Sequence, residues 1–384
     1  MKMKKRIIPE GVPCLVILGV IFGYLGYKMG VPNMMKTIMA TANDLLLNTC
    51  FFLMAVCVIT GALGKILSEF GVVKLCEKIL RPLMKPLFNL PGTASLGACL
   101  TFLSDNPAII TLAHDRKFAR FFKKYQLISL TNFGTAFGMG LLVIVCMVTQ
   151  KGVSPAAPFI GLFGAFCGCM VSTRIMQFLI CRANPEYKTE WAVDPIEEGQ
   201  AALMEDDDEG VKKPLFMRIL DSVLDGGKAG VEIGLSIIPG VLVISTLVMI
   251  LTFGAGSGGN FTGAAFEGVE LLPKIAAKVS FIFEALFGFT DPHVVAFPIT
   301  ALGAVGAALG LVPGFLEKGW MDNNAIAVCT AIGMCWSGYL STHTAMLDSL
   351  GFRSLTSKAI LAHTIGGIAA GVVAHWTWVL VSIF

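Results

Sequence analysis

Long apolar runs separated by short polar segments dominate the chain. These runs are long enough to cross about 30 Å of hydrocarbon as helices, at about 1.5 Å per residue. Alternating segments of about ten residues, which are typical of membrane-barrel strands, are not found in the sequence. The pattern therefore predicts an all-α polytopic membrane protein, with spans near residues 11–31, 43–66, 125–149, 155–181, 229–254, 276–313 and 357–383.

Composition supports this class. Of the 384 residues, 55% are hydrophobic and 14% are charged, whereas about a quarter of the residues of a soluble domain are charged. The net charge of +3 indicates no nucleic-acid partner, because the basic residues flank the apolar runs. The 11 cysteines lie almost wholly within apolar segments without CxxC spacing, so we interpret them as buried apolar side chains.

The basic residues also predict the orientation. Met1 to Arg6 followed by an apolar stretch could be a signal peptide, but no small-residue cleavage site follows, so we interpret it as a retained first span. A cytoplasmic N-terminus places most Lys and Arg on the cytoplasmic side. The chain then divides into an N-terminal membrane half (1–182), a cytoplasmic linker (183–225) and a C-terminal membrane half (226–384).

The linker carries the acidic run Glu205–Glu209. Such a run could bind calcium or regulate the protein, but it lacks the ligand alternation and the glycine of an EF-hand loop. A solvated linker is the simpler interpretation.

Matched polar interruptions occur in the two halves. Ser104-Asp105-Asn106-Pro107 interrupts the first half and Ser341-Thr342-His343-Thr344 the second, and each precedes a Gly-rich apolar segment, 125–138 and 358–371. We expect two re-entrant helical hairpins, at about 90–113 and about 323–350. Broken segments in corresponding halves are the best sequence pointer to the binding site of a transporter.

The halves are predicted to be inverted repeats. In this topology the span 43–66 runs inward and its partner 229–254 runs outward, which is the arrangement of inverted-topology transporters. Aligning these spans places Asp44 and Asn48 opposite Lys228 and Glu232, each an i, i+4 pair on one helix face. The amphipathic segment 74–86, interrupted by proline, is expected to lie along the cytoplasmic interface.

Ionisable residues inside the membrane cost roughly 3 kcal/mol on insertion scales, so they are candidates for function. Asp105 is the strongest, because Ser104, Asp105 and Asn106 offer oxygen ligands that suit Na⁺ or a proton. The alternative is that Asp105 caps the helix that begins at Pro107. One residue can do both.

Other polar residues invite the same two interpretations. His343 could carry a proton or donate to a solute, or it could be a helix-terminal histidine bonded to backbone. Glu232 could contact solute, or it could pair with Lys228. Asn132, with Thr131, could line a central cavity opposite His363 and Thr364. The predicted solute- and ion-binding residues are Ser104, Asp105, Asn106, Asn132, Glu232, Ser341, Thr342, His343 and Thr344, without a metal site other than Na⁺ at Asp105.

The run 81–92, RPLMKPLFNLPG, leading into 95–113, resembles the nucleoside-recognition or Gate membrane proteins, which include spore maturation proteins and are related to concentrative nucleoside transporters. The resemblance extends over about 44–150 and 225–383. It implies oppositely oriented re-entrant hairpins, with tips at 101–108 and 337–345, and unwound helices around a solute and a coupling Na⁺ or H⁺. It also implies a homo-oligomer in a bacterial inner membrane. A Gln-Thr-Glu motif for nucleosides has no clear match, so the resemblance does not establish the substrate.

Three functions follow for comparison. The first is a secondary transporter of a small polar solute, such as a nucleoside or nucleobase, working by ion-coupled alternating access; the sequence lacks a Walker A motif for ATP. The second is a non-transporting membrane scaffold of the spore-maturation type. An intramembrane enzyme has little support, because HExxH and GxSxG are absent. We expect a transporter with no cofactor besides the coupling ion, whose partners are the solute and the lipid bilayer.

Overall fold

The computed structural model describes residues 4–104, 107–193, 214–337 and 339–383. These residues form helices, apart from turns and one isolated bridge between Lys123 and Trp191. The all-α fold predicted from the hydrophobic pattern is confirmed. Within these described ranges, six helical stretches are long and apolar enough to cross a membrane: Glu10–Met29, Val31–Glu69, Lys124–Val148, Ala156–Ala183, Leu215–Thr252 and Arg353–Val381. The protein is a multi-pass membrane protein, while its cytoplasmic N-terminus, its bacterial inner-membrane location and its oligomeric state stay predictions.

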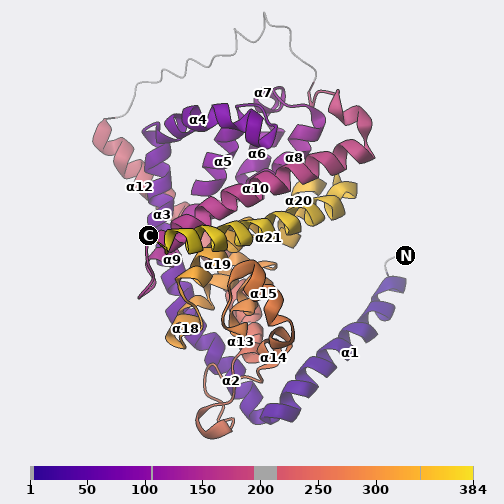
Figure 1. Cartoon of the computed structure of the whole chain (residues 1–384), viewed down its shortest axis with the longest axis vertical. Helices are drawn as coiled ribbons and strands as arrows, with labels where there is room; N and C mark the ends of the chain where they lie inside the picture. Colours follow the sequence, from indigo (N-terminus) through magenta and orange to yellow (C-terminus); the bar gives the residue numbers. More distant parts are fainter. Residues whose placement is uncertain (1–3, 105–106, 194–213, 338, 384) are drawn as a thin grey trace, which may run out of the picture.

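The first half contains a long helix, a helix along the edge of the molecule, a pair of short helices, a broken helix and a second long helix (Figure 1). In chain order these are α1 (Lys4–Met29), α2 (Val31–Asp44), η1 (Leu45–Cys50), α3 (Phe51–Glu69), α4 (Val72–Leu83), η2 (Met84–Phe88), α5 (Ala94–Leu103), α6 (Pro107–His114), α7 (Arg116–Ala119), α8 (Lys124–Thr135), α9 (Gly140–Val148), α10 (Ala156–Ala183) and η3 (Pro185–Lys188).

The second half begins and ends with a long helix and has shorter helices between them. Its elements are α12 (Leu215–Pro239), η5 (Gly240–Ser245), α13 (Thr246–Thr252), η6 (Ser257–Gly259), α14 (Leu271–Ala276), η7 (Ala277–Val279), α15 (Ser280–Phe287), η8 (Pro292–Val295), α16 (Ala296–Ala301), α17 (Val305–Leu309), α18 (Val312–Glu317), α19 (Asn323–Cys335), α20 (Tyr339–Ser349), η9 (Arg353–Leu355) and α21 (Thr356–Val381).

The two halves run in opposite directions. The α2–α3 helix rises toward α4 in Figure 1, whereas the helix that begins with α12 descends toward α13. Each of these two helices contains one π-helical turn, η1 and η5, and the two turns pack against each other. The π-helical turn is rare and often marks functional positions, so its presence in both helices supports the internal repeat.

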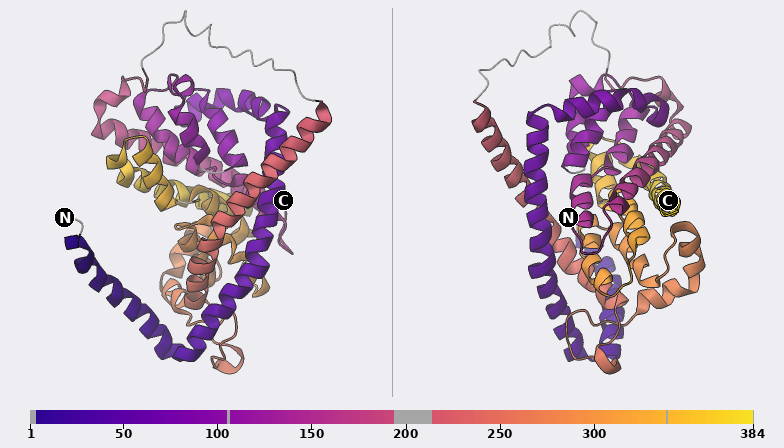
Figure 2. Two further views of the ribbon diagram at one scale, coloured as in Figure 1. Left: turned by 180° about the vertical axis from the view of Figure 1, so that it is seen from behind. Right: turned by 60° about the vertical axis from the view of Figure 1, so that its left-hand side comes forward.

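Two pairs of long helices hold the fold together. Helix α3 packs along α12, and the two cross in Figure 2, while α10 packs along α21. Small residues allow both approaches: Gly230 faces the backbone of Val58, and Gly168 faces Gly366 and Ala370. Close packing of helix backbones through small residues is the usual way in which helices associate within membranes.

The first predicted hairpin corresponds to α5 and α6, two short helices that pack against each other. Their connection, Asp105 and Asn106, lies outside the described residues. Ile109 on α6 fits against Gly97 on α5 and Gly134 on α8, so the pair is anchored on the broken helix. Re-entry of this pair into the membrane stays a prediction.

The second predicted hairpin, 323–350, is wrong. Helix α19 packs on α10 and α21, whereas α20 packs on α8 and α21. In this half the short helices α16 and α17 pack on each other and meet at Leu302, Gly303 and Ala304. The expected continuous span 276–313 is therefore also wrong. Pro292 and the β-region backbone of Ala304 divide it into short helices.

The predicted match between the two polar interruptions, 104–107 and 341–344, also fails, because the second one is helical. Residues 341–345 lie within helix α20, and the break in this half begins at Trp336, which has φ −96° and ψ 23°. Segment 125–138 leads into the break between α8 and α9, whereas segment 358–371 lies within the unbroken helix α21. By order of elements, α5 and α6 correspond to α16 and α17, and α8 and α9 correspond to α19 and α20.

The segment predicted to lie along the interface forms α4 and η2. Lys74, Lys78, Arg81 and Lys85 recur along one face and are exposed, whereas Val73 and Met84 are buried against the bundle. This distribution fits an amphipathic helix at a membrane surface. In Figure 1 it lies across one end of the molecule, beyond the end of α3.

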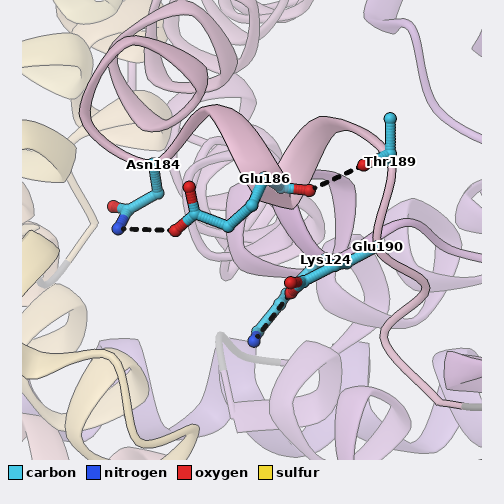
Figure 3. A network of polar contacts seen from close by, with 5 residues as sticks. All are labelled: Lys124, Asn184, Glu186, Thr189 and Glu190. Carbon is cyan, nitrogen blue, oxygen red and sulfur yellow. Dashed lines mark hydrogen bonds and ion pairs between the residues drawn. The ribbon is translucent and has the colours of Figure 1, made fainter.

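A polar network fixes the end of α10 to the start of α8 (Figure 3). Glu186 accepts hydrogen bonds from Asn184 at its carboxylate (3.3 Å) and from Thr189 at its backbone carbonyl (3.1 Å). Lys124 forms an ion pair of 3.2 Å with Glu190. The first residues of the predicted linker 183–225 are thus attached to the helical body, while 194–213, including the acidic run 205–209, lie outside the described residues.

Candidate functional site

A chain of buried polar groups lies beside the break between α19 and α20. Asn132 on α8 donates to Ser172 on α10 (3.0 Å) and to the backbone carbonyl of Ala359 on α21 (2.9 Å). The Ser172 hydroxyl lies 2.7 Å from Nδ1 of His363 on α21. All three side chains are fully buried. Satisfied polar networks of this kind fix the relative positions of the elements that contribute to them, here three separate helices.

His363 continues this chain to the break itself. Its Nε2 contacts the carbonyl oxygen of Cys335, the last residue of α19, and its own carbonyl accepts a hydrogen bond of 3.2 Å from the Trp336 indole. A carbonyl oxygen only accepts, so Nε2 of His363 carries the hydrogen. Nδ1 of the neutral ring is then the acceptor of the Ser172 hydroxyl hydrogen.

His343 on α20 lies next to His363, with 4.5 Å between the ring centroids. Its Nδ1 is 2.8 Å from the carbonyl oxygen of Tyr339, one turn earlier in α20, so Nδ1 carries the hydrogen. Its Nε2 is buried and has no hydrogen-bond partner among the described residues. A buried polar atom without a partner is uncommon and calls for an explanation.

The breaks of the two halves meet directly. Ser337, in the break between α19 and α20, donates a hydrogen bond of 3.2 Å to the carbonyl of Thr135, the last residue of α8. Met139, between α8 and α9, has a φ of 57°, a left-handed conformation that costs energy for a residue with a side chain. Such backbone strain is concentrated at functional sites.

A small cavity of about 140 Å³ lies where these breaks approach α12 and the turn between α16 and α17. Its polar side chains are the hydroxyls of Ser236, Ser337 and Thr342, and its remaining lining is apolar or glycine. Hydroxyl groups donate and accept, which suits an uncharged polar solute. The complete lining is Met139, Ser236, Ile237, Gly240, Ala304, Val305, Gly306, Ala307, Ser337 and Thr342.

A larger cavity of about 920 Å³ lies along η1 and the loop after α13. Asp44, Glu267, Glu270 and Glu317 contribute carboxylates to it, against the single cation of Lys318. The predicted pair of Asn48 and Asp44 is present as a hydrogen bond of 3.1 Å. This cavity is wide and acidic, so it disfavours anionic solutes.

Glu267 has a structural role at the edge of this cavity. Its carboxylate accepts hydrogen bonds from the backbone N–H groups of Thr262 and Gly263, each 2.9 Å, and from the Thr262 hydroxyl, 2.6 Å. Burial raises the pKa of Glu267, but these donors outweigh it and hold the pKa below its ordinary value. Glu267 therefore stabilises the loop as a carboxylate.

The predicted site residues are only partly brought together. Asn132 and His343 both join the polar cluster, and Thr342 lines the small cavity. The Ser104 hydroxyl donates to the carbonyl of Leu100 in its own helix (2.7 Å), as expected of a chain end at a break. Asp105, Asn106 and the side chain of Ser341 lie outside the described residues, and Thr344 is half-buried on α20.

Glu232 does not join the site. It is exposed on α12, as is Lys228, and the described ion pairs do not include one between them. Of the solute-facing candidates on this helix, Ser236 lines the small cavity instead. The reason is helical geometry, because Ser236 follows Glu232 by four residues but lies nearer to the π-helical turn η5, where α12 approaches α17.

The sequence also left out residues that complete the cluster. Ser172 lies in the apolar run 155–181, and Tyr339, whose hydroxyl is 2.5 Å from that of Thr364, precedes the interruption. An isolated serine in an apolar span was the available signal. Among the described residues, no group of three or more His, Cys, Asp or Glu could hold a metal ion. Sodium at Asp105 remains a prediction.

Comparisons with known proteins agree with this architecture. Residues 56–151, from α3 to the end of α9, match the Gate family, described as nucleoside recognition. Comparison with curated proteins gives no match. A variant of CNTnw in an outward-facing state is similar over 99% of this chain and 88% of that chain, with a TM-score of 0.57 at 13% identity. CNTnw in an inward-facing substrate-bound state is similar over 94% and 90%, with a TM-score of 0.51 at 15% identity. Residues 56–151 thus match the Gate model, and the chain shares its overall fold with the CNTnw structures.

Proposed function

We propose that the protein is a secondary transporter that carries a small uncharged polar solute across the membrane by alternating access. The observation that carries this proposal is the convergence of two helix breaks and the turn between α16 and α17 on one cavity lined by hydroxyls. Broken helices that expose backbone groups within a membrane are tolerated where they line a cavity or lie buried in protein. Transporters place their solute and coupling ion at such breaks.

The fold supports the conformational part of the proposal. The solved CNTnw structures that share this fold include outward-facing, intermediate and inward-facing states, so the architecture accommodates that cycle in CNTnw. In this chain, the elements around the cavity come from both halves and from opposite directions. Relative movement of the halves would open the cavity to one side at a time.

Nucleosides and nucleobases are the first solutes to test. The Gate match and the fold motivate this class, and the hydroxyl-lined, uncharged cavity fits neutral molecules that donate and accept hydrogen bonds. We propose coupling to an ion gradient as the energy source. The protein is then a carrier and not an enzyme.

Counterflow in proteoliposomes tests the proposal. Vesicles loaded with unlabelled uridine, adenosine or hypoxanthine should accumulate the labelled compound when the protein is present. Thr342→Val removes a cavity hydroxyl at constant volume and should slow exchange about tenfold, as expected of a lost hydrogen bond of about 1.4 kcal/mol. Thr149→Val, an exposed position at the end of α9, is the matched control.

Folded wild type that exchanges none of these compounds would contradict transport of this class. A scaffold predicts that outcome, together with unchanged assembly of the protein with its partners in the Thr342→Val variant.

A further inference from the structure

The pair formed by His343 and His363 has no explained task in solute binding. Both side chains are 0% exposed, and neither lines the small cavity. Ionisable residues in the interior of a membrane protein are costly to retain and mark ion or proton pathways. The pair therefore calls for a function of its own.

The hydrogen bonds of His363 are complete in the neutral state. Nε2–H donates to the carbonyl of Cys335, and Nδ1 accepts from Ser172, whose oxygen in turn accepts from Asn132. The tautomer follows from these partners, because a carbonyl cannot donate. His363 is thus held rigidly on the last carbonyl of α19.

His343 differs at one atom. Nδ1–H donates to the carbonyl of Tyr339, which leaves Nε2 with a lone pair that has no partner among the described residues. This atom is a basic nitrogen, whereas hard cations such as Ca²⁺ and Mg²⁺ take oxygen ligands. A nitrogen lone pair favours a proton over Na⁺. Imidazole is also the side chain that ordinarily changes charge between pH 5 and 8.

Among the described residues, the helices around the pair place no buried carboxylate beside it. The pair is enclosed by α8, α10, α19, α20 and α21, and α6 packs on α20. Asp348 is the one carboxylate on these helices, and it is exposed at the end of α20. The Arg174 guanidinium and the His114 ring are exposed as well, and Lys358 on α21 is half-buried. The titratable groups buried with the pair are Cys169, Cys329, Cys335 and Tyr339.

A proton on this pair would therefore favour a different arrangement of the helices. A buried charge without a partner is unfavourable, so protonation favours a conformation in which water reaches Nε2. The histidines contact both sides of the break, at Cys335 and at Tyr339, so such a change would alter the break itself. Thr342, next to His343, lines the cavity, which connects protonation with solute binding.

We propose that His343 and His363 form the binding site of the proton that drives transport, and that Nε2 of His343 is the atom that takes it up. This inference rests on the proposed transport function. On the side with the higher proton concentration, the Nε2 lone pair accepts a proton from hydronium, and the ring becomes imidazolium. On the other side the Nε2–H bond breaks and the proton returns to water. The pair binds one proton, because a second charge 4.5 Å away would be repelled.

Nitrogen-15 NMR of the histidine-labelled protein in lipid nanodiscs tests proton binding without a solute. The chain has 5 histidines, and the signals of the pair are assigned by their loss in His343→Gln and His363→Gln. At pH 8 we expect the Nδ1–H tautomer for His343 and the Nε2–H tautomer for His363. Lowering the pH to 4 should convert His343 to imidazolium and leave His363 neutral. An unchanged His343 signal across this range would overturn the proposal.

Flux measurements test coupling. In proteoliposomes with labelled uridine as the probe, an inward acid gradient should accelerate wild-type uptake several-fold, without Na⁺. His343→Gln should abolish this acceleration, so that the ratio of uptake with and without the acid gradient, measured per folded molecule, falls to about one. His114→Gln, an exposed histidine on α6, should behave as wild type.

The outcomes separate the two proposals. Exchange by the wild type that responds to Na⁺ and not to the acid gradient would refute the proton site and leave transport intact. Absence of exchange together with a titrating His343 would refute transport of uridine and leave proton binding intact. Should His343→Gln fail to fold, the wild-type NMR titration still decides the question.

Discussion

The helix pairs α3–α12 and α10–α21 both pack through small residues, but the second pair is also joined by a hydrogen bond between side chains. Between α3 and α12, Gly61, Gly226 and Gly230 bring the backbones into contact, and the buried Thr60 hydroxyl bonds to Val56 in its own helix. Between α10 and α21, glycines and alanines do the same, but Ser172 and His363 bond across the interface. Small residues thus allow the helix backbones to approach closely in both pairs, and the polar bonds between α10 and α21 also fix the relative position of these two helices.

This difference distinguishes the pair α3 and α12, which is expected mainly to stabilise the fold, from the pair α10 and α21, which is expected to take part in transport. Polar bonds across helices hold one geometry and make the site sensitive to movement of α21, whereas an apolar contact transmits little besides stability. Substitutions between α3 and α12 are therefore expected to change stability alone. Substitutions between α10 and α21 are expected to change transport as well.

The largest loss of stability is expected for Gly230→Ala. The added Cβ would lie 2.6 Å from Cα of Val58, and a backbone atom cannot move aside. We expect a loss of about 3 kcal/mol, the upper end for overpacking, measured as a lower melting temperature in detergent. Gly227→Ala on the same helix is the control, because its Cβ would meet Val58 Cγ1 at 3.7 Å, an ordinary contact. Equal melting temperatures of the two variants would contradict the packing argument.

Gly168→Ala places the same modification in the other pair. Its Cβ would lie 2.5 Å from Ala370 Cβ and from the Gly366 carbonyl, so α10 and α21 must separate slightly. We expect a loss of about 2 kcal/mol and a decrease in counterflow per folded molecule, because Ser172 and His363 move apart. Counterflow per folded molecule should be unchanged in Gly230→Ala. A similar decrease in counterflow in both variants would contradict the proposed difference between the α3–α12 and α10–α21 pairs.

The sequence predicted the all-helical class and most spans because length and apolarity alone determine which segments cross a membrane. The hairpin of the second half was placed at the wrong helices, because the polar run 341–345 was interpreted as a break. The run 341–345 remains helical, since His343 bonds to a carbonyl of its own helix, whereas the break begins at Trp336, outside the polar run. Polarity along a sequence does not show which groups tertiary contacts will satisfy.

The site was predicted in part for a related reason. Asn132 and His343 were identified, because amide and imidazole groups in apolar spans need partners. Ser172 was not, because a serine hydroxyl can bond within its own helix, as Ser104 does, and only the approach of α21 turns it toward His363. Glu232 lies outside the cluster and the small cavity, because the sequence does not show which face of α12 packs on α3.

Ser172→Ala compares a bond across helices with one within a helix. Removal of the hydroxyl leaves Nδ1 of His363 without its donor in a buried place, which should cost about 1–2 kcal/mol. Thr60→Val is the counterpart between α3 and α12. Its hydroxyl bonds only to carbonyls of α3, and those carbonyls also take part in the helix, so we expect a loss below about 0.5 kcal/mol. Melting temperatures of both variants, with counterflow of each, measure the difference.

The smallest effect is expected at low pH from Glu267, in the loop after α13. Its pKa is lower in the folded protein than in the unfolded chain, so its contribution to stability is full above about pH 4.5 and is lost as the pH falls through the folded pKa. Glu267→Gln should lower the melting temperature at pH 7 by roughly 2–4 °C, the change that about 1 kcal/mol produces in a domain of this size range. The difference from wild type should shrink toward pH 4. The pH dependence of counterflow should be the same in both proteins, since Glu267 bonds within the loop after α13 and does not line the small cavity. A shifted transport profile would mean that this loop, and not the His343 and His363 pair alone, responds to protons.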